Sequence, residues 1–267
     1  MSGRPKAAHA RAPQSYPLRV AVIGSGAAGL AAGWSLSRHH DVTLFEADGR
    51  LGGHAHTVDV DLGGKTFPVD TGFIVYNEVN YPSLTAAFAE LGVETEASNM
   101  SFSVSQDEGR FEYSGRWPGG LFAQRRNLVS PRYWRMLADI RRFYSRAVND
   151  LAPLERNGTS LGDYIAQSGY SATFRDRHLL PMVGAIWSTP TGSAQAMPAA
   201  AVIRFFHGHG LLKIKNRPQW RTVTGGSRNY VKRLMADFGG QVLSGRPVDA
   251  VLRHGDKVTI RVEGKDA

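Results

Sequence analysis

The sequence predicts an α/β fold in which a parallel sheet is interrupted by a mostly helical insertion. Near the start, two short β-branched runs, Leu18–Ile23 and Asp41–Phe45, flank the Ala- and Leu-rich segment Ala27–Ser37. A strand–helix–strand unit of this kind is the building block of parallel sheets. After a long middle part with helical periodicity, strand-like runs return at Gln241–Leu243, Val248–Arg253 and Val258–Val262.

The composition is that of a folded protein with a basic surface. Hydrophobic residues make up 42% of the 267 residues, which is enough for a core. Because there is no cysteine, a disulfide scaffold, a thiolate zinc site and a cysteine nucleophile are excluded, and we expect a reducing, cytoplasmic setting. The net charge is +9, and its densest stretch, Arg125 to Arg146, is expected to be a solvated helix face.

The N-terminal segment Met1 to Pro17 is polar and without periodicity, which predicts a disordered leader over residues 1–17. The apolar run Val20–Leu36 follows it. We do not interpret this run as a signal peptide, because its glycines fall at positions that a ligand motif explains. No stretch elsewhere reaches the roughly 18 uninterrupted apolar residues that a spanning helix needs.

The elements that follow the first unit are short. Val58–Leu62 and Thr66–Val69 flank Gly63-Gly64, which predicts a hairpin. A helix is expected from Tyr81 to Leu91, before Gly92. Short strands are expected at Ser101–Val104 and Arg110–Tyr113.

Ser130-Pro131 begins the clearest helix of the middle part, since Ser is a good N-cap and Pro fits the first turn. Its expected buried face carries Tyr133, Leu137, Ile140, Tyr144 and Val148. Aromatic residues alternate with arginines here, but we expect the aromatic side chains on the buried face and therefore predict no nucleic-acid binding. Further helices are expected near Leu161–Gln167, Thr173–Leu180, Ala194–Phe206 and Ser227–Phe238.

A glycine-rich turn, Gly24-Ser25-Gly26-Ala27-Ala28-Gly29, stands between the first strand and the first helix. The spacing GxGxxG at this place is the dinucleotide-binding fingerprint of a Rossmann-like fold. The first glycine permits the tight turn, the second lets a pyrophosphate approach the backbone, and the third lets helix and strand pack closely. The N-terminus of the helix then attracts the phosphates.

Glu46 ends the second strand about 20 residues after the motif, where a carboxylate accepts hydrogen bonds from the adenosine ribose. Strand, turn, helix, strand and acid fall in register, which an incidental glycine-rich turn would not produce. The sequence therefore predicts that the chain holds the ADP part of a dinucleotide.

Arg50 and Gly52-Gly53-His54 follow Glu46. The glycine pair lets a second loop run close to the same pyrophosphate, and Arg50 adds positive charge. With these residues, the pattern from Val20 to Gly53 resembles the flavin-containing amine oxidoreductase superfamily, which includes monoamine oxidases and phytoene-type desaturases.

Later segments extend the resemblance. Phe67–Ile74 is similar to the family segment that passes the isoalloxazine ring, and Trp220–Ser227 to the segment before the return to the FAD domain. Pro247–Val251 is similar to the strand that meets the adenine. Gly52-Gly53-His54 and Ile186-Trp187-Ser188 resemble the branch labelled predicted NAD/FAD-binding protein.

The resemblance implies an FAD-dependent oxidoreductase that removes a hydride from an amine or from an unsaturated lipid or isoprenoid-type substrate. The implied FAD domain covers 18–80 and 220–267, and the substrate domain 81–219. The family pattern ends on a second glycine-rich segment that does not occur before Ala267, so we expect the FAD domain to be incomplete. The predicted cofactor contacts are Gly24, Ser25, Gly26, Ala27, Ala28, Gly29, Glu46, Ala47, Arg50, Gly52, Gly53, His54, Gly72, Phe73, Ile74 and Val248.

Two alternative functions fit the same residues. One is an NAD(P)-dependent dehydrogenase, against which the Gly52-Gly53 pair argues, and the other is a non-catalytic dinucleotide-binding protein. No metal site is predicted, because the pairs His54/His56 and His207/His209 have no third ligand beside them. No catalytic residue is assigned, since the flavin performs the redox step in such enzymes. A small, apolar substrate is expected, and with an acyl or isoprenoid substrate a peripheral membrane contact is an open alternative.

Overall fold

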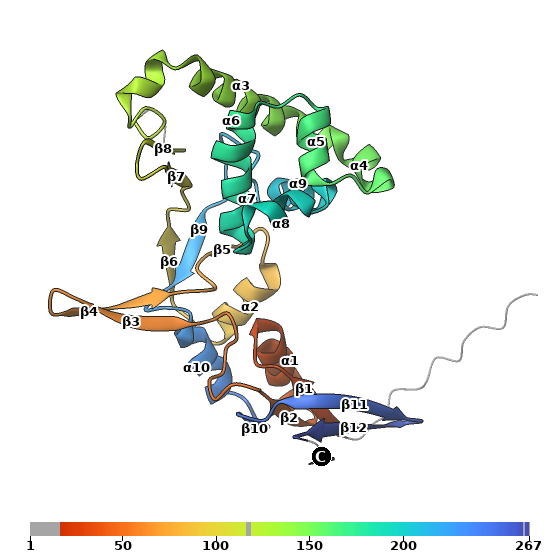
Figure 1. The fold of residues 1–267 in the computed structure, drawn as a ribbon. Helices are drawn as coiled ribbons and strands as arrows, with labels where there is room; N and C mark the ends of the chain where they lie inside the picture. The colour runs from red at the N-terminus through yellow and green to blue at the C-terminus, as the bar shows by residue number, and fades with distance from the viewer. Residues whose placement is uncertain (1–16, 116–118, 264, 267) are drawn as a thin grey trace, which may run out of the picture. The chain divides into compact units, whose positions relative to one another are not determined.

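The computed structural model describes residues 17–115, 119–263 and 265–266. The predicted leader lies outside these residues, apart from Pro17. The chain folds as two compact units (Figure 1): the first comprises the chain up to Ile74, Leu84–Glu96 and the part from Thr222 onward, and the second comprises Val75–Ser83 and Ala97–Arg221. The domain limits predicted from the sequence stay a prediction; in the structure, Leu84–Glu96 groups with the first unit.

A parallel sheet of the order β1-β2-β10 organises the first unit, as the α/β prediction requires. Its strands are β1 (Arg19–Ile23), β2 (Asp41–Phe45) and β10 (Gln241–Leu243). The central strand is β2, and its last residue, Phe45, is aligned with Ile23 of β1 and with Leu243 of β10. Helix α1 (Ala27–Ser37) connects β1 to β2 and packs against α10 (Arg228–Ala236).

Two antiparallel elements complete this unit. The hairpin β3 (Thr57–Leu62) and β4 (Lys65–Asp70) turns at Gly63-Gly64 as predicted. At the C-terminal end, β11 (Val248–His254), β12 (Lys257–Val262) and β13 (Lys265–Asp266) form an antiparallel sheet. Helix α2 (Pro82–Glu90) lies within the predicted range Tyr81 to Leu91, and β6 (Thr95–Ser98) follows it.

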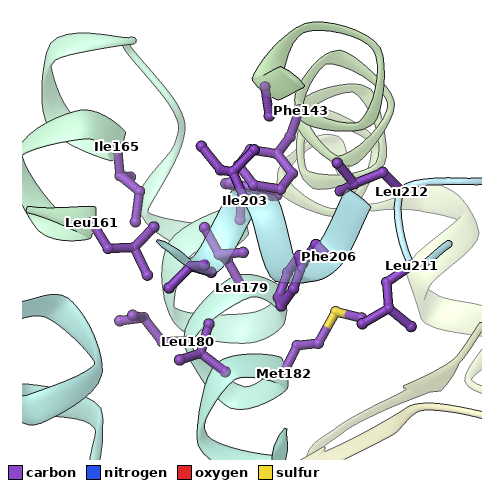
Figure 2. Packing of buried hydrophobic residues seen from close by; sticks show 14 of the residues in the cluster. Phe143, Leu161, Ile165, Leu179, Leu180, Met182, Ile203, Phe206, Leu211 and Leu212 are labelled. Atoms are coloured by element: carbon purple, nitrogen blue, oxygen red, sulfur yellow. The ribbon is translucent and has the colours of Figure 1, made fainter. Parts of the chain in front are cut away.

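The second unit is mostly helical and has its own apolar core. In Figure 2, Ile203 and Phe206 lie among Phe143, Leu179, Leu180 and Met182. Its strands are β5 (Tyr76–Asn77), which pairs with β9 (Trp220–Val223), and the hairpin β7 (Ser103–Gln106) and β8 (Phe111–Ser114). Its helices are α3 (Pro131–Arg146), α4 (Leu151–Asn157), α5 (Leu161–Gln167), α6 (Ala172–Phe174), α7 (Leu180–Trp187), α8 (Thr191–Ala196) and α9 (Ala199–Gly208).

Two predicted helices differ from those in the structure. The single helix expected over Ala194–Phe206 is divided into α8 and α9, because Met197 and Pro198 are extended, with ψ of 144° and 122°. A residue before proline avoids the helical region, so the chain breaks there. The helix expected over Thr173–Leu180 is longer, since α6 continues into α7 through a π-helical turn at Arg175–Leu179.

Helix α3 begins as predicted, with the Ser130 hydroxyl accepting a hydrogen bond from the Tyr133 amide at 3.3 Å. Tyr133 and Phe143 are buried. Trp134, however, is 49% exposed, which corrects the expectation that the aromatic residues of this helix all lie on the buried face. Consecutive helical residues point about 100° apart, so Trp134 cannot share the buried face with Tyr133.

Among the residues that the structure describes, no helix is both long enough and apolar enough to cross a membrane.

Candidate functional site

The turn between β1 and α1 brings two backbone segments into close contact. Gly24 has φ +90°, a conformation that glycine adopts without strain, and its amide donates to the Phe45 carbonyl at 2.8 Å. A Cβ atom on Gly29 would overlap the carbonyl oxygen of Gly24. Helix and turn therefore approach more closely than any residue with a side chain at position 29 would allow.

The N-terminus of α1 is open. Gly26 is the N-cap and provides no side-chain hydrogen bond, and the first turn carries no acidic residue. The first amides of a helix have no acceptor within the helix. A Cβ atom on Gly26 would meet nothing within 4 Å, and Ala27 and Ala28 are exposed. This end of α1 therefore has the free donors, the positive dipole and the space that an anion requires.

Glu46 lies beside this turn at the end of β2. Its Oε2 accepts hydrogen bonds from the Ser25 amide, at 2.7 Å, and from the Ser25 hydroxyl, while Oε1 accepts from the Asp48 amide at 3.0 Å. Ser25 is fully buried. The side chain of Ser25 thus serves to hold Glu46 in place from within the protein.

The hydrogen bonds around Glu46 determine its charge. Partial burial alone would raise the pKa of this carboxyl group, but donation from the Ser25 hydroxyl and from the amides of Asp48, Ser25 and Ala47 outweighs burial, so the pKa lies below its ordinary value. Glu46 is therefore ionised at neutral pH. A carboxylate has about four acceptor positions, so it keeps capacity for a further donor such as a hydroxyl group.

The second glycine loop lies against the first. The Gly52 amide is 3.1 Å from both the carbonyl and the hydroxyl oxygen of Ser25. A Cβ atom on Gly53 would stand 3.0 Å from the Cα atom of Gly26. Arg50 points back into its own loop, where it donates to the carbonyls of Leu51, Gly53 and Ala55 at 3.2, 2.8 and 3.1 Å.

The segment after β4 contacts the second glycine loop at His54. The Phe73 amide donates to the His54 carbonyl at 2.7 Å, and a Cβ atom on Gly72 would overlap that carbonyl oxygen. Phe73 packs edge-on against Tyr230 with ring centroids 6.0 Å apart. Ile74 is 56% exposed, and its carbonyl accepts from the Thr222 hydroxyl at 2.8 Å. The backbone at Gly53 therefore lies against Gly26, and the backbone at Gly72 lies against the neighbouring residue His54.

Val248 lies in a separate apolar cluster. It packs with Leu243 against a small cluster of Phe45, Ile260 and Val262. The segment that leads to it runs alongside Glu46, whose carbonyl accepts from the Arg246 amide at 2.8 Å. Val248 thus packs beside Phe45, the residue directly before Glu46.

Asp70 was not predicted as a site residue. Its Oδ1 accepts from the Ser227 amide at 2.9 Å, the Ser227 hydroxyl at 2.7 Å and the Thr57 hydroxyl at 2.6 Å. Ser227 is the N-cap of α10 and is fully buried, and the Arg228 amide donates to Thr57 Oγ1 at 3.0 Å. Asp70 thereby joins the two family-like segments Phe67–Ile74 and Trp220–Ser227. The only sequence signal was an acidic residue within the first of these segments.

One histidine of each pair has structural partners. His209 Nδ1 lies 2.9 Å from the Phe205 carbonyl and Nε2 lies 3.2 Å from the Tyr81 hydroxyl, and its ring stacks on Phe205 at 3.8 Å. His56 Nδ1 lies 3.0 Å from the Thr71 hydroxyl. Within the described part of the chain, no three His, Cys, Asp or Glu side chains gather as a metal site.

A parallel sheet, a glycine-rich strand-to-helix turn, an open helix N-terminus and an acid at the end of β2 define a dinucleotide-binding protein. Residues 27–267 match the model of the flavin containing amine oxidoreductases. The chain belongs to this family, as the sequence predicted.

Individual relatives agree with the family. The chain is 28% identical over 265 residues to AofH of Mycobacterium tuberculosis, a candidate flavin-containing monoamine oxidase, covering 92% of this chain and 54% of AofH. It is 25% identical over 274 residues to the carotenoid phi-ring synthase of Chlorobaculum tepidum, covering 94% of this chain and 40% of that protein. A structure of putrescine oxidase has the same fold, with a TM-score of 0.65 and 19% identity over 94% of this chain and 57% of that one.

The chain spans about half the length of the curated relatives it matches. At the level of the family, the predicted flavin cofactor and oxidoreductase class are confirmed. Membership in a flavin-containing family also argues against the alternative of an NAD(P)-dependent dehydrogenase.

Proposed function

We propose that this chain holds the ADP part of FAD in an FAD-dependent oxidoreductase whose substrate is an amine or an unsaturated lipid or isoprenoid-type molecule. The observation that carries the proposal is the open N-terminus of α1, where Gly26 has free space around it and Gly53 lies against it. Two glycine loops side by side at an uncapped helix fit a pyrophosphate, which needs close backbone approach from more than one direction.

Each predicted residue then has a physical role. The amides of Gly26, Ala27 and Ala28 would face the pyrophosphate, and Glu46 would accept hydrogen bonds from the adenosine ribose. Ser25 would hold Glu46 and Gly52 in position through its buried hydroxyl. Arg50 would shape the second loop by binding its carbonyls, and it would add positive charge near the phosphates.

The flavin, when bound, supplies the acceptor for a hydride from the substrate. The chain's own contribution would be the orientation of the cofactor by Gly72, Phe73 and Ile74. The names of two relatives, a candidate monoamine oxidase and a carotenoid phi-ring synthase, support the two proposed substrate classes, and an apolar substrate stays a prediction. The cytoplasmic compartment stays a prediction.

The test compares three versions of the full chain: wild type, Gly26→Ala and Gly192→Ala. FAD binding is followed by quenching of flavin fluorescence. A methyl group at Gly26 meets no protein atom within 4 Å, so Gly26→Ala should keep the wild-type melting temperature but bind FAD at least about tenfold more weakly, about 1.4 kcal/mol. Gly192 lies in α8 with equally free space, so Gly192→Ala should bind like wild type.

Competition with the two halves of the cofactor distinguishes an ADP site from a flavin site. AMP should displace FAD from the wild-type chain, and riboflavin should not. If riboflavin displaces FAD and AMP does not, the chain binds the flavin half of the cofactor and the assignment is wrong. If NAD binds and FAD does not, an NAD(P)-dependent dehydrogenase replaces the proposed flavoprotein.

A further inference from the structure

An exposed apolar tip lies where α3 begins. It consists of Leu128, Val129 and Trp134, whose side chains are 48%, 84% and 49% exposed. The Trp134 Nε1–H donates to the Leu128 carbonyl at 2.8 Å, which fixes the indole ring beside the turn. The ring of Phe122 packs against Trp134 with centroids 5.4 Å apart. The tip is therefore ordered and apolar, and its one indole donor is already satisfied.

The segment that carries this tip is rich in arginine. The segment from Arg125 to Arg146 contains seven arginines and one acidic residue, Asp139, which is buried and pairs with Arg135 and Arg142. The remaining five are exposed and take part in no ion pair within the described residues: Arg125, Arg126, Arg132, Arg141 and Arg146. Within the segment Arg125 to Arg146, positive charge therefore far exceeds negative charge; exposed Glu112, whose backbone contacts Gln124 and Asn127, is an acidic neighbour from β8.

The chemistry of this surface matches an anionic bilayer. Tryptophan is enriched where hydrocarbon meets headgroups, and small apolar side chains beside it add buried area. Arginines at the same level attract anionic headgroups. Because the Trp134 N–H is already bonded, inserting the ring leaves no unpaired donor in the hydrocarbon.

Nucleic acid fits this surface less well. Single-stranded binding uses several exposed aromatic rings on which successive bases stack. Of the aromatic residues in α3, Tyr133 and Phe143 are buried and Tyr144 is half-buried, which leaves Trp134 as the one exposed ring of that helix. Leu128 and Val129 would make no favourable contact with phosphates.

We propose that Leu128, Val129 and Trp134, with the arginines around them, form a docking surface for an anionic lipid bilayer. The proposal concerns the second unit alone and does not rest on FAD binding. It gives the chain a means of lying on a membrane without a spanning helix.

The experiment measures sedimentation of the full chain with vesicles of phosphatidylcholine, alone or mixed with phosphatidylserine. Wild type should bind the mixed vesicles, and added salt should weaken the binding. Arg125→Gln with Arg132→Gln should lower the partition coefficient about fivefold per arginine, the equivalent of about 1 kcal/mol per basic residue near an anionic surface. Val129→Ser with Trp134→Ser should also weaken binding.

The matched control is Leu62→Ser with Arg253→Gln, which removes an exposed apolar residue and an exposed arginine from the first unit. It should bind like wild type, and all variants should keep the wild-type melting temperature. Brominated lipids should quench tryptophan fluorescence less in Trp134→Phe than in wild type.

Three results would overturn the proposal. One is equal binding to neutral and anionic vesicles, or none to either. Another is equal loss of binding in the control variant, which would mean that net charge alone is responsible. The last is binding of an oligonucleotide that depends on Arg125 and Arg132 while vesicles are not bound, which would assign the surface to nucleic acid.

Discussion

Glu46 is stabilised in its charged form by donors that belong to the protein. Its pKa is lowered below the ordinary value of 4.5, mainly because the Ser25 and Asp48 donors overcome partial burial. A carboxyl group whose pKa is depressed on folding adds stability above its unfolded pKa and loses it as the pH falls through the folded pKa.

We therefore expect Glu46→Gln to lower the free energy of unfolding at pH 7 by about 1–2 kcal/mol, because a charge-assisted hydrogen bond is lost. The difference from wild type should shrink as the pH falls below about 4.5 and the wild-type carboxyl protonates. Urea titrations over a pH series measure it. A difference that stays constant down to pH 3 would contradict the role of the charge.

Helix α10 depends on a side chain from another element. The Asp70 carboxylate receives the Ser227 amide and hydroxyl at the start of this helix, where a negative charge also complements the helix dipole. Asp59 offers a comparison, since it pairs with Arg228 of the same helix at 2.7 Å but is exposed.

The difference in exposure between Asp70 and Asp59 predicts different losses of stability when either carboxylate is removed. Asp70→Asn should lower the free energy of unfolding by about 1–2 kcal/mol, because the amide oxygen of Asn accepts the Ser227 hydrogen bonds without the charge that strengthens them and complements the helix dipole. Asp59→Asn should cost much less than Asp70→Asn, because exposed ion pairs contribute little. Thermal unfolding of both variants checks it, and equal losses would show that Asp70 is not the anchor of α10.

Elements defined by local pattern could be predicted from the sequence. The bounds of α1, β2, α5 and β10 agree with the prediction to the residue, because each is a short run of consistent composition that ends at a turn, a cap or a change of residue type. Strands β5 and β9 could not be found in the same way: β5 is two residues long, and its existence depends on a partner far along the chain. Pro198 could have been recognised as a break, since proline removes a helical donor.

The same distinction between local and long-range features applies to the residues of the candidate site. The glycine motif, Glu46 and the second glycine pair are close in sequence, and the structure brings them together as the pattern indicates. The contact between Asp70 and Ser227 joins residues 157 positions apart, and nothing local announces it. The burial of Ser25 could not be predicted from the sequence either, because a serine in a glycine-rich turn is usually exposed.

For the molecule as a whole, acid should affect the second unit through His178. This side chain is buried among aromatic rings, and burial lowers its pKa to about 3. Its Nδ1 lies 2.7 Å from the Tyr113 hydroxyl, and its Nε2 has no partner in the described residues. Below pH 6.5, the ordinary pKa of histidine, the unfolded chain binds a proton at His178 and the folded unit does not. The free energy of unfolding therefore has its full value above pH 6.5 and decreases as the pH falls below 6.5.

We expect the unfolding free energy of wild type to fall by up to about 1.4 kcal/mol per pH unit between pH 6.5 and 3 on account of this residue. His178→Phe should lose this contribution, so its slope over that range should be shallower. Tyr113→Phe removes the hydrogen bond but keeps the histidine buried, and should retain the wild-type slope. The same slope in His178→Phe and wild type would show that other groups account for the acid sensitivity.

The hydroxyl of Ser25 ties the first glycine-rich turn to two points of the loop that follows β2: it donates to Glu46 and accepts from Gly52. Neither loop can therefore loosen without releasing a buried partner of the other. In the native ensemble, the two sides of the site should open to solvent as one cooperative event, and backbone hydrogens on both should exchange at a common rate. A single oxygen atom thus couples the fluctuations of the first glycine-rich turn, Glu46 and the second glycine loop.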